Sequence, residues 1–306
     1  MPHVMLSWPD ALIIAACLVI VAGLSRVPRV ARTWTGWGLW GGVAWEAALL
    51  FALYGLWQFA GSFTVMGPAG AVPRARWLWN AERVLHLPSE TSVQRIFLPH
   101  PLLVQAFNFY YDILHFPVLG ACLIWLYARH RDRYRGIRTT VVLFTFASLL
   151  IQLIPVAPPR MLPGTGLVDT AVRYGQSVYS SHGGFDADQL SAMPSVHVGW
   201  ALIIAIAVIT VSRGRWRWLA AGYPALTLLV VVVTANHFWL DGIVAGFLVA
   251  AVLLAQLLTR RLARTLRPGG SGSLPEGGPP AETGAVHGED PASGTGAVRG
   301  EMPVRS

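Results

Sequence analysis

Two histidines and one aspartate occur in short motifs that combine nucleophilic and acid–base chemistry. His237 and Asp241 stand four residues apart in "HFWLD", a spacing that puts both side chains on one face of a helix. A carboxylate there can accept a hydrogen bond from one imidazole nitrogen, which fixes the tautomer and leaves the other nitrogen free to attack. His197 in "PSVH" supplies a second imidazole, able to protonate a leaving oxygen as a general acid.

Two further residues have the chemistry to hold a phosphate. Arg160 in "PVAPPRMLPG" offers a planar fork that matches phosphate oxygens. Ser195 follows Pro194 at the expected start of a helix, where a hydroxyl and free N–H groups favour an anion. A nucleophilic His, an acid His, an Arg and a helix N-terminus together predict phosphoryl transfer through a phosphohistidine.

The elements that position these residues are expected to cross a membrane. The chain has 306 residues, of which 54% are hydrophobic and only 12% are charged, whereas a soluble domain has about 25% charged residues. The apolar runs predict an all-α, polytopic membrane helix bundle with six or seven transmembrane helices. They lie at residues 10–24, 38–61, 113–128, 139–157, 195–211, 219–235 and 238–258.

The charge pattern predicts the orientation of these spans. The net charge is +8 and every basic residue is Arg. Most of these Arg residues lie in four loops, after the first, third, fifth and seventh runs, and cytoplasmic loops carry such an excess. The pattern excludes a nucleic-acid-binding face. It predicts an extracytoplasmic N-terminus and a cytoplasmic C-terminus, and it places the motif residues of four segments together at the extracytoplasmic ends of their helices.

Composition divides the chain into three expected parts. Residues 1–36 hold an N-terminal transmembrane helix and a cytoplasmic loop, and residues 37–267 form the catalytic membrane domain. Within that domain the less apolar, Pro-containing segment 64–110 is expected to form extracytoplasmic interfacial helices. Residues 268–306 are rich in Gly, Pro and Ala and are expected to be a disordered cytoplasmic tail.

The motifs resemble those of the type 2 phosphatidic acid phosphatase (PAP2) superfamily. Its second motif is of the P-S-x-H type, matched by Pro194, Ser195 and His197, and its third ends in H-x-x-x-D, matched by His237 and Asp241. The resemblance implies a PAP2-like helical core in which His237 is the nucleophile, Asp241 its partner and His197 the general acid. It implies neither a metal nor another cofactor.

Two cations of the family motifs are absent. Leu153 stands at the position of a Lys and Val231 at that of an Arg, so Arg160 is the remaining motif cation. This pattern, with "PPRMLPGTGLVDT" and "NFYYDILHFP", resembles the branch of inositol phosphorylceramide synthases and their bacterial relatives, in which a head-group phosphate passes to an alcohol. Candidate substitutes for phosphate binding, on position alone, are Asn108, Tyr111, His115 and Asp169.

The expected function is therefore a phosphotransferase that acts on a lipid head-group phosphate at the extracytoplasmic face of a bacterial plasma membrane. Its partners would be the bilayer, a lipid phosphate donor and an alcohol or lipid acceptor. Three alternatives are a lipid phosphatase, a metal-dependent intramembrane hydrolase that uses His197, His237 and Asp241 as ligands, and a non-enzymatic lipid transporter.

Several residues also have structural explanations. Ser195 can simply cap its helix, and Arg160 can extend toward lipid head groups. Asp169 can pair with Arg173 in a loop. Glu46, well inside the second expected span, can either pair within the bundle or serve a proton-related role.

Overall fold

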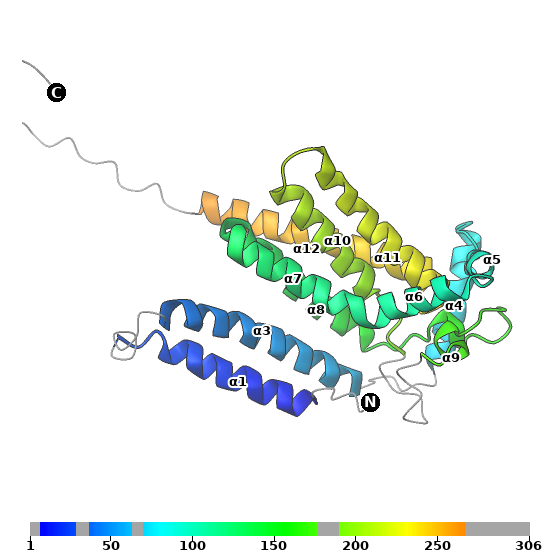
Figure 1. Ribbon diagram of the computed structural model, residues 1–306, viewed down its shortest axis with the longest axis horizontal. Helices are drawn as coiled ribbons and strands as arrows, with labels where there is room; N and C mark the ends of the chain where they lie inside the picture. The colour runs from blue at the N-terminus through cyan, green and yellow to red at the C-terminus, as the bar shows by residue number, and fades with distance from the viewer. Residues whose placement is uncertain (1–6, 29–36, 63–69, 177–189, 267–306) are drawn as a thin grey trace, which may run out of the picture. The chain divides into compact units, whose positions relative to one another are not determined.

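The computed structural model describes residues 7–28, 37–62, 70–176 and 190–266, and the chain divides into two compact units, 1–261 and 262–306. The tail expected at 268–306 lies outside the described residues. The first helices are α1 (Trp8–Leu24), α3 (Trp37–Ser62), α4 (Ala71–Val84), α5 (Glu90–Phe97), α6 (Pro101–Phe109), the π-helical turn η2 (Tyr110–Leu114), α7 (His115–Arg129) and α8 (Arg131–Gln152). A 3-10 turn η3 (Pro159–Met161) and the short α9 (Thr170–Arg173) precede α10 (Val196–Val211), the 3-10 segment η5 (Arg215–Ala221), α11 (Gly222–Val233) and α12 (Trp239–Thr265) (Figure 1).

The described residues confirm the all-α prediction, and β-structure within them is confined to one bridge between Val156 and Ser191. Four helical segments are long and apolar enough to cross a membrane: 101–129, 131–152, 215–233 and 239–265. Three shorter apolar helices lie at 8–24, 40–56 and 196–211. All seven apolar runs of the sequence are thus mainly helical, although α1, with 17 residues, and α10, with 16, are shorter than the usual span.

The third span begins earlier than the sequence suggested. Residues 101–109, expected to lie along the interface, form α6, which continues through η2 into α7 as one segment of spanning length. Pro101 suits the start of α6, because a helix needs no hydrogen bond from its first N–H group. A π turn in mid-helix is often found at functional sites, and Tyr111 lies in this one.

One ion pair joins α3 to α8 inside the apolar layer. Glu46 accepts hydrogen bonds from Arg138, at 2.5 Å, and from the Tyr134 hydroxyl, at 2.8 Å. A carboxylate at membrane depth is tolerated when such partners satisfy it. Of the two roles considered for Glu46, the structure therefore shows pairing within the bundle.

The core of the bundle lies between α7, α8, α10 and α12. Leu126, Phe144, Ile203 and Val249 belong to one buried cluster contributed by these four helices. Gly199 allows α10 to approach α8 closely, since a Cβ at this position would lie 1.9 Å from Cζ of Phe144. Trp200 of α10 donates a hydrogen bond to Thr145 of α8 at 2.9 Å, which fixes the rotation of the two helices.

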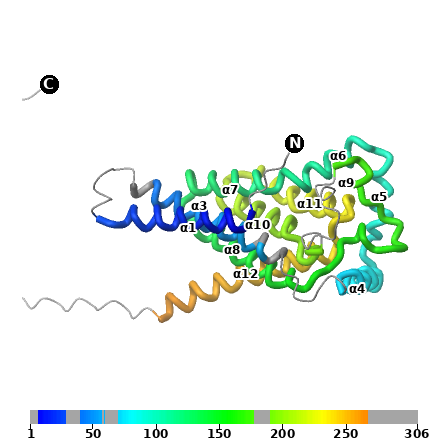
Figure 2. The backbone as a smooth tube through the Cα atoms, turned by 90° about the horizontal axis from the view of Figure 1, so that it is seen from below, coloured from blue at the N-terminus to red at the C-terminus, as the bar shows by residue number. Residues whose placement is uncertain are grey.

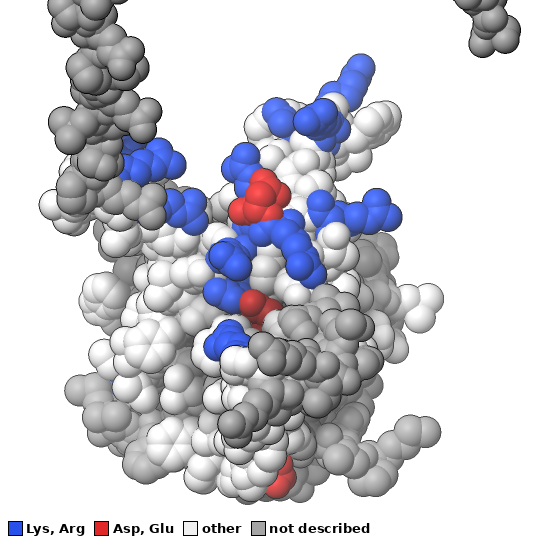
Figure 3. Space-filling model, turned by 90° about the vertical axis from the view of Figure 1, so that its left-hand side faces the viewer, with Lys and Arg blue, Asp and Glu red and all other residues white. Residues whose placement is uncertain are grey.

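The two ends of α7 differ in character. His115 begins the helix, and Arg129 ends it, next to Arg131 and Arg133 at the start of α8. Figure 3 shows Arg side chains gathered on the end of the molecule where α7 passes into α8. Figures 1 and 2 show α4, α5, α6 and α9 toward the other end of α7. The candidate residues lie at this second end.

Candidate active site

Backbone hydrogen bonds bring three loop segments together at the start of α10 and α12. The segment after α8 pairs with the segment before α10, through Val156 N to Leu190 O at 2.7 Å and Ala192 N to Val156 O at 3.2 Å. The N–H group of Arg160 donates to the carbonyl of Ala235 at 3.1 Å. These bonds fix the loops that carry Arg160, Ser195 and His237, which are distant in sequence.

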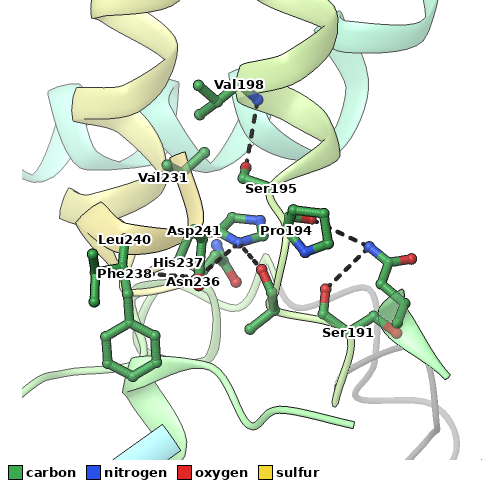
Figure 4. A network of polar contacts seen from close by, with 12 residues as sticks. Ser191, Pro194, Ser195, Val198, Val231, Asn236, His237, Phe238, Leu240 and Asp241 are labelled. Carbon is green, nitrogen blue, oxygen red and sulfur yellow. Dashed lines mark hydrogen bonds and ion pairs between the residues drawn. The ribbon is translucent and has the colours of Figure 1, made fainter. Parts of the chain in front are cut away.

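The imidazole of His237 has a fixed orientation. Its Nδ1 lies 2.7 Å from the carbonyl oxygen of Ala192 and 3.3 Å from Oδ2 of Asp241 (Figure 4). A carbonyl oxygen can only accept, so Nδ1 must carry the hydrogen and donate it. In the neutral form of the ring, the second nitrogen, Nε2, then has the lone pair that a nucleophile needs.

Asp241 is fully buried and has two functions in the same turn. Its Oδ2 accepts the N–H group of Phe238 at 2.8 Å, which satisfies one of the free donors at the N-terminus of α12. The same oxygen lies beside His237 Nδ1, as the sequence predicted. Sequence reasoning missed the shorter contact, from the Ala192 carbonyl, because a main-chain oxygen has no signature in the residue types.

His197, in the first turn of α10, lies beside His237. Their ring centroids are 5.7 Å apart, and the ring of Tyr111 stacks on His197 at 4.3 Å with an interplanar angle of 25°. Tyr111 is also 6.1 Å from the His237 ring, so it contacts the pair from η2. The two imidazole rings are close enough for one phosphate group to contact both of them. This arrangement matches the roles of nucleophile and general acid.

His115 is positioned behind His197, and the structure does not favour it as a phosphate ligand. It is buried, with 1% of its surface exposed, and its Nε2 lies 2.6 Å from the carbonyl oxygen of His197. Its ring is 4.8 Å from the His197 ring. Because the carbonyl requires a donor, Nε2 carries the hydrogen, and His115 thereby anchors the backbone of His197.

Arg160 is held on two sides. Its Nε lies 3.2 Å from Oδ2 of Asp169, and its Nη1 donates to Oδ1 of Asn236, the neighbour of His237. Asp169 was a candidate for phosphate binding or for a loop pair with Arg173. The structure instead pairs this carboxylate with Arg160, and a carboxylate that orients a guanidinium does not itself attract phosphate. Asn236 is a site residue that the sequence analysis missed.

Ser195 and Asn108 have structural partners. The hydroxyl of Ser195 is buried and accepts the Val198 N–H at 3.4 Å as the N-cap of α10. The amide of Asn108 accepts from Thr170 at 2.7 Å and donates to Gln176 at 2.9 Å. With both amide groups occupied, Asn108 fixes the segment around α9, and the structure does not support its predicted contact with phosphate.

Apolar side chains occupy the positions of the two absent motif cations. Val231 is buried against Val198, and its carbonyl accepts the N–H groups of Asn236 and His237 at 3.0 and 3.2 Å. Leu153 ends α8 as its C-cap residue. Within the described ranges, no group of three or more His, Cys, Asp or Glu residues has the arrangement to hold a metal ion.

An apolar helical protein in which two histidine rings lie side by side, one of them next to a buried carboxylate, has features expected of a membrane phosphatase or phosphotransferase. A sequence profile of the PAP2 superfamily matches residues 76–256, which is more than half of the chain, and the chain belongs to this superfamily. Its members act on phosphate esters as phosphatases or phosphotransferases. No curated protein and no solved structure matches the chain in the corresponding comparisons.

Proposed function

We propose that this protein is a phosphotransferase that moves the head-group phosphate of a lipid to an acceptor alcohol through a phosphohistidine on His237. The observation that carries the proposal is the bond from His237 Nδ1 to the Ala192 carbonyl, which leaves Nε2 as the nucleophile. The proposed roles of His197 as general acid and Arg160 as phosphate ligand rest on their positions beside it.

The reaction has two steps. In the first, Nε2 of His237 forms a bond to phosphorus while the bond to the leaving oxygen breaks, and His197 gives that oxygen a proton. In the second, His197 takes the proton of the acceptor hydroxyl, whose oxygen bonds to phosphorus as the P–N bond breaks. Asp241 and the Ala192 carbonyl stabilise the Nδ1–H group as positive charge develops on the ring.

The small number of cationic side chains at the site favours a donor with a single negative charge. Arg160 is partly neutralised by Asp169, and Leu153 and Val231 occupy the positions of two family cations. A phosphodiester has one negative charge, whereas a phosphate monoester or a diphosphate has more and needs more compensation. This balance supports transfer from a phosphodiester head group over hydrolysis of phosphatidate or an isoprenyl diphosphate, which is the second candidate function.

We also propose that the active site faces the extracytoplasmic side of a plasma membrane. His115 and Arg129 begin and end α7, so the site and the Arg-rich turn are separated by a helix of about 22 Å. Arg-rich turns stay in the cytoplasm. Trypsin should therefore cut at Arg131 and Arg133 in inverted vesicles and leave them intact in spheroplasts, and the opposite pattern would reverse the assigned face.

The proposed function is tested with purified protein and radiolabelled donors. Phosphatidylinositol, phosphatidate and an isoprenyl diphosphate are each incubated with and without an alcohol acceptor, beside His237→Ala as the blank. Label on the acceptor with wild type alone supports a phosphotransferase. Free phosphate alone supports a phosphatase instead. Activity abolished by EDTA and restored by a metal ion would favour the metal-dependent hydrolase, and lipid transport that survives His237→Ala would favour the transporter.

A further inference from the structure

Two acidic side chains are fully buried behind the first turn of α12. Glu82 of α4 and Glu90 of α5 both have no exposed surface. Glu82 Oε1 accepts the N–H group of Leu240 at 2.8 Å, and Leu240 lies between His237 and Asp241. A buried carboxylate is unfavourable unless it is paired or protonated. The location therefore raises the question of how these two acids are accommodated beside the catalytic turn.

The charged groups around Glu82 favour a protonated carboxyl group. Arg83 of α4 bonds Oε2 of Glu90 and lies 3.9 Å from Oε2 of Glu82, with a third of its side chain exposed. Asp241 of α12 is a third acidic group close to them. One partly exposed cation thus faces three carboxyl groups. Burial first, and then the hydrogen bond to Glu90, raise the pKa of Glu82 to about 9.

A protonated Glu82 is compatible with both of its neighbours, the Leu240 N–H group and the Glu90 carboxylate. Its carbonyl oxygen accepts the Leu240 N–H, and its O–H group can donate to Glu90, which pairs with Arg83. The Leu240 N–H is one of the free donors at the start of α12, and the Phe238 N–H, bonded to Asp241, is another. Glu82 and Asp241 together therefore fix the start of α12, directly after His237.

We propose that Glu82 is a positioning residue: by accepting the Leu240 N–H group it holds the first turn of α12, so that Asp241, and His237 just before the helix, keep their reactive geometry. This inference rests on the proposed function, since it assigns Glu82 to the same site. Glu82 touches no reacting atom and acts through the Leu240 N–H group.

The sign of the pH effect follows from the raised pKa. The contribution of this proton to folding stability is complete below about 4.5 and declines as the pH rises toward about 9. The proton itself leaves the folded protein only as the pH passes about 9. Activity that depends on the neutral acid should therefore be retained near neutral pH and fall on the alkaline side, when a second negative charge appears beside Asp241.

The test compares Glu82→Gln and Glu82→Ala with wild type, and Asp132→Asn serves as the control because Asp132 is an exposed carboxylate on the α7–α8 turn. A glutamine keeps the acceptor for Leu240 and a donor for Glu90 without a titratable proton. We expect Glu82→Gln to keep kcat at pH 7 and to lose the alkaline fall of the wild type. Glu82→Ala should lower kcat by about 10- to 100-fold, because a small misplacement of the reacting groups has that effect. The control should match wild type throughout.

A second measurement does not need turnover. Amide hydrogen exchange at residues 238–242, followed in purified protein without substrate, should be slow in wild type and in Glu82→Gln and faster in Glu82→Ala. Wild type without His237-dependent turnover but with this exchange pattern would refute the proposed function and leave the anchoring of α12 intact. A Glu82→Gln variant that is as impaired as Glu82→Ala at pH 7, or that keeps the alkaline fall, would overturn the inference even if Glu82→Ala does not fold.

Discussion

Replacing Asp241 with Asn tests how the nucleophile is oriented. The substitution keeps the size of the side chain and an oxygen that can accept the Phe238 N–H, now at 2.8 Å from Oδ2, but it removes the negative charge. His237 Nδ1 keeps its shorter bond to the Ala192 carbonyl at 2.7 Å. We therefore expect the tautomer to survive the substitution and the rate to fall only by the loss of charge stabilisation.

The expected fall in kcat can be worked out from the contact that the substitution removes. A hydrogen bond to a charged group contributes about 1.5–3 kcal/mol, which corresponds to a fall in kcat of about 10- to 150-fold. The contact that is lost, at 3.3 Å, is longer than the one that remains. In a serine-protease triad, where the wrong tautomer results, the same Asp-to-Asn change lowers kcat by about 10⁴. The predicted loss here is smaller because a second acceptor holds the Nδ1–H group.

The assay combines kinetics with spectroscopy. kcat is measured with the donor that wild type uses best, and ¹⁵N spectra of histidine-labelled protein report which nitrogen of His237 carries the hydrogen. Unchanged thermal unfolding is the control for folding. A loss of about 10⁴ together with a changed tautomer would refute this account, because Asp241 alone would then set the tautomer. A loss below about threefold would show that its charge plays no part in the transition state.

The remaining predictions concern the acid, the phosphate ligand and the packing of α10. His197→Ala should lower kcat most for a donor with a poor leaving group, and an equal loss with an activated aryl ester would contradict the acid role. Arg160→Lys should not restore the activity lost in Arg160→Ala, because Asp169 and Asn236 bind two sides of a guanidinium; full rescue would show that charge alone suffices. Gly199→Ala should lower the unfolding temperature, since overpacking against Phe144 destabilises by about 1–3 kcal/mol, and unchanged melting would show that α8 can move aside.

The sequence predicted the parts of the site that depend on residue spacing and membrane depth. His237 and Asp241 are in contact as their spacing suggested, but His237 precedes α12, which begins at Trp239, so the predicted shared helix face was wrong. His197 was correctly placed in the first turn of its own helix. The apolar runs likewise predicted the helices, since a bilayer requires continuous apolar segments of a known length. These inferences need only the spacing of residues along one element at a time.

The contacts that were missed depend on the path of loops. The Ala192 carbonyl reaches His237 because the segment before α10 pairs with Val156, and Asn236 reaches Arg160 through the turn at Ala235, which has a φ of 55°. Asn108 was proposed from its position along the chain alone, which does not give the rotation about the helix axis, and its amide faces Thr170 and Gln176.

The central claim is that His237 becomes phosphorylated during turnover, and rapid quenching of the purified enzyme with a ³²P-labelled donor tests it most directly. The account predicts protein-bound label that is stable in alkali, labile in acid and located on the peptide containing His237 in wild type. The label should be absent in His237→Ala and should pass to an added acceptor. Turnover without such label, or label retained in His237→Ala, would contradict a covalent mechanism at this histidine.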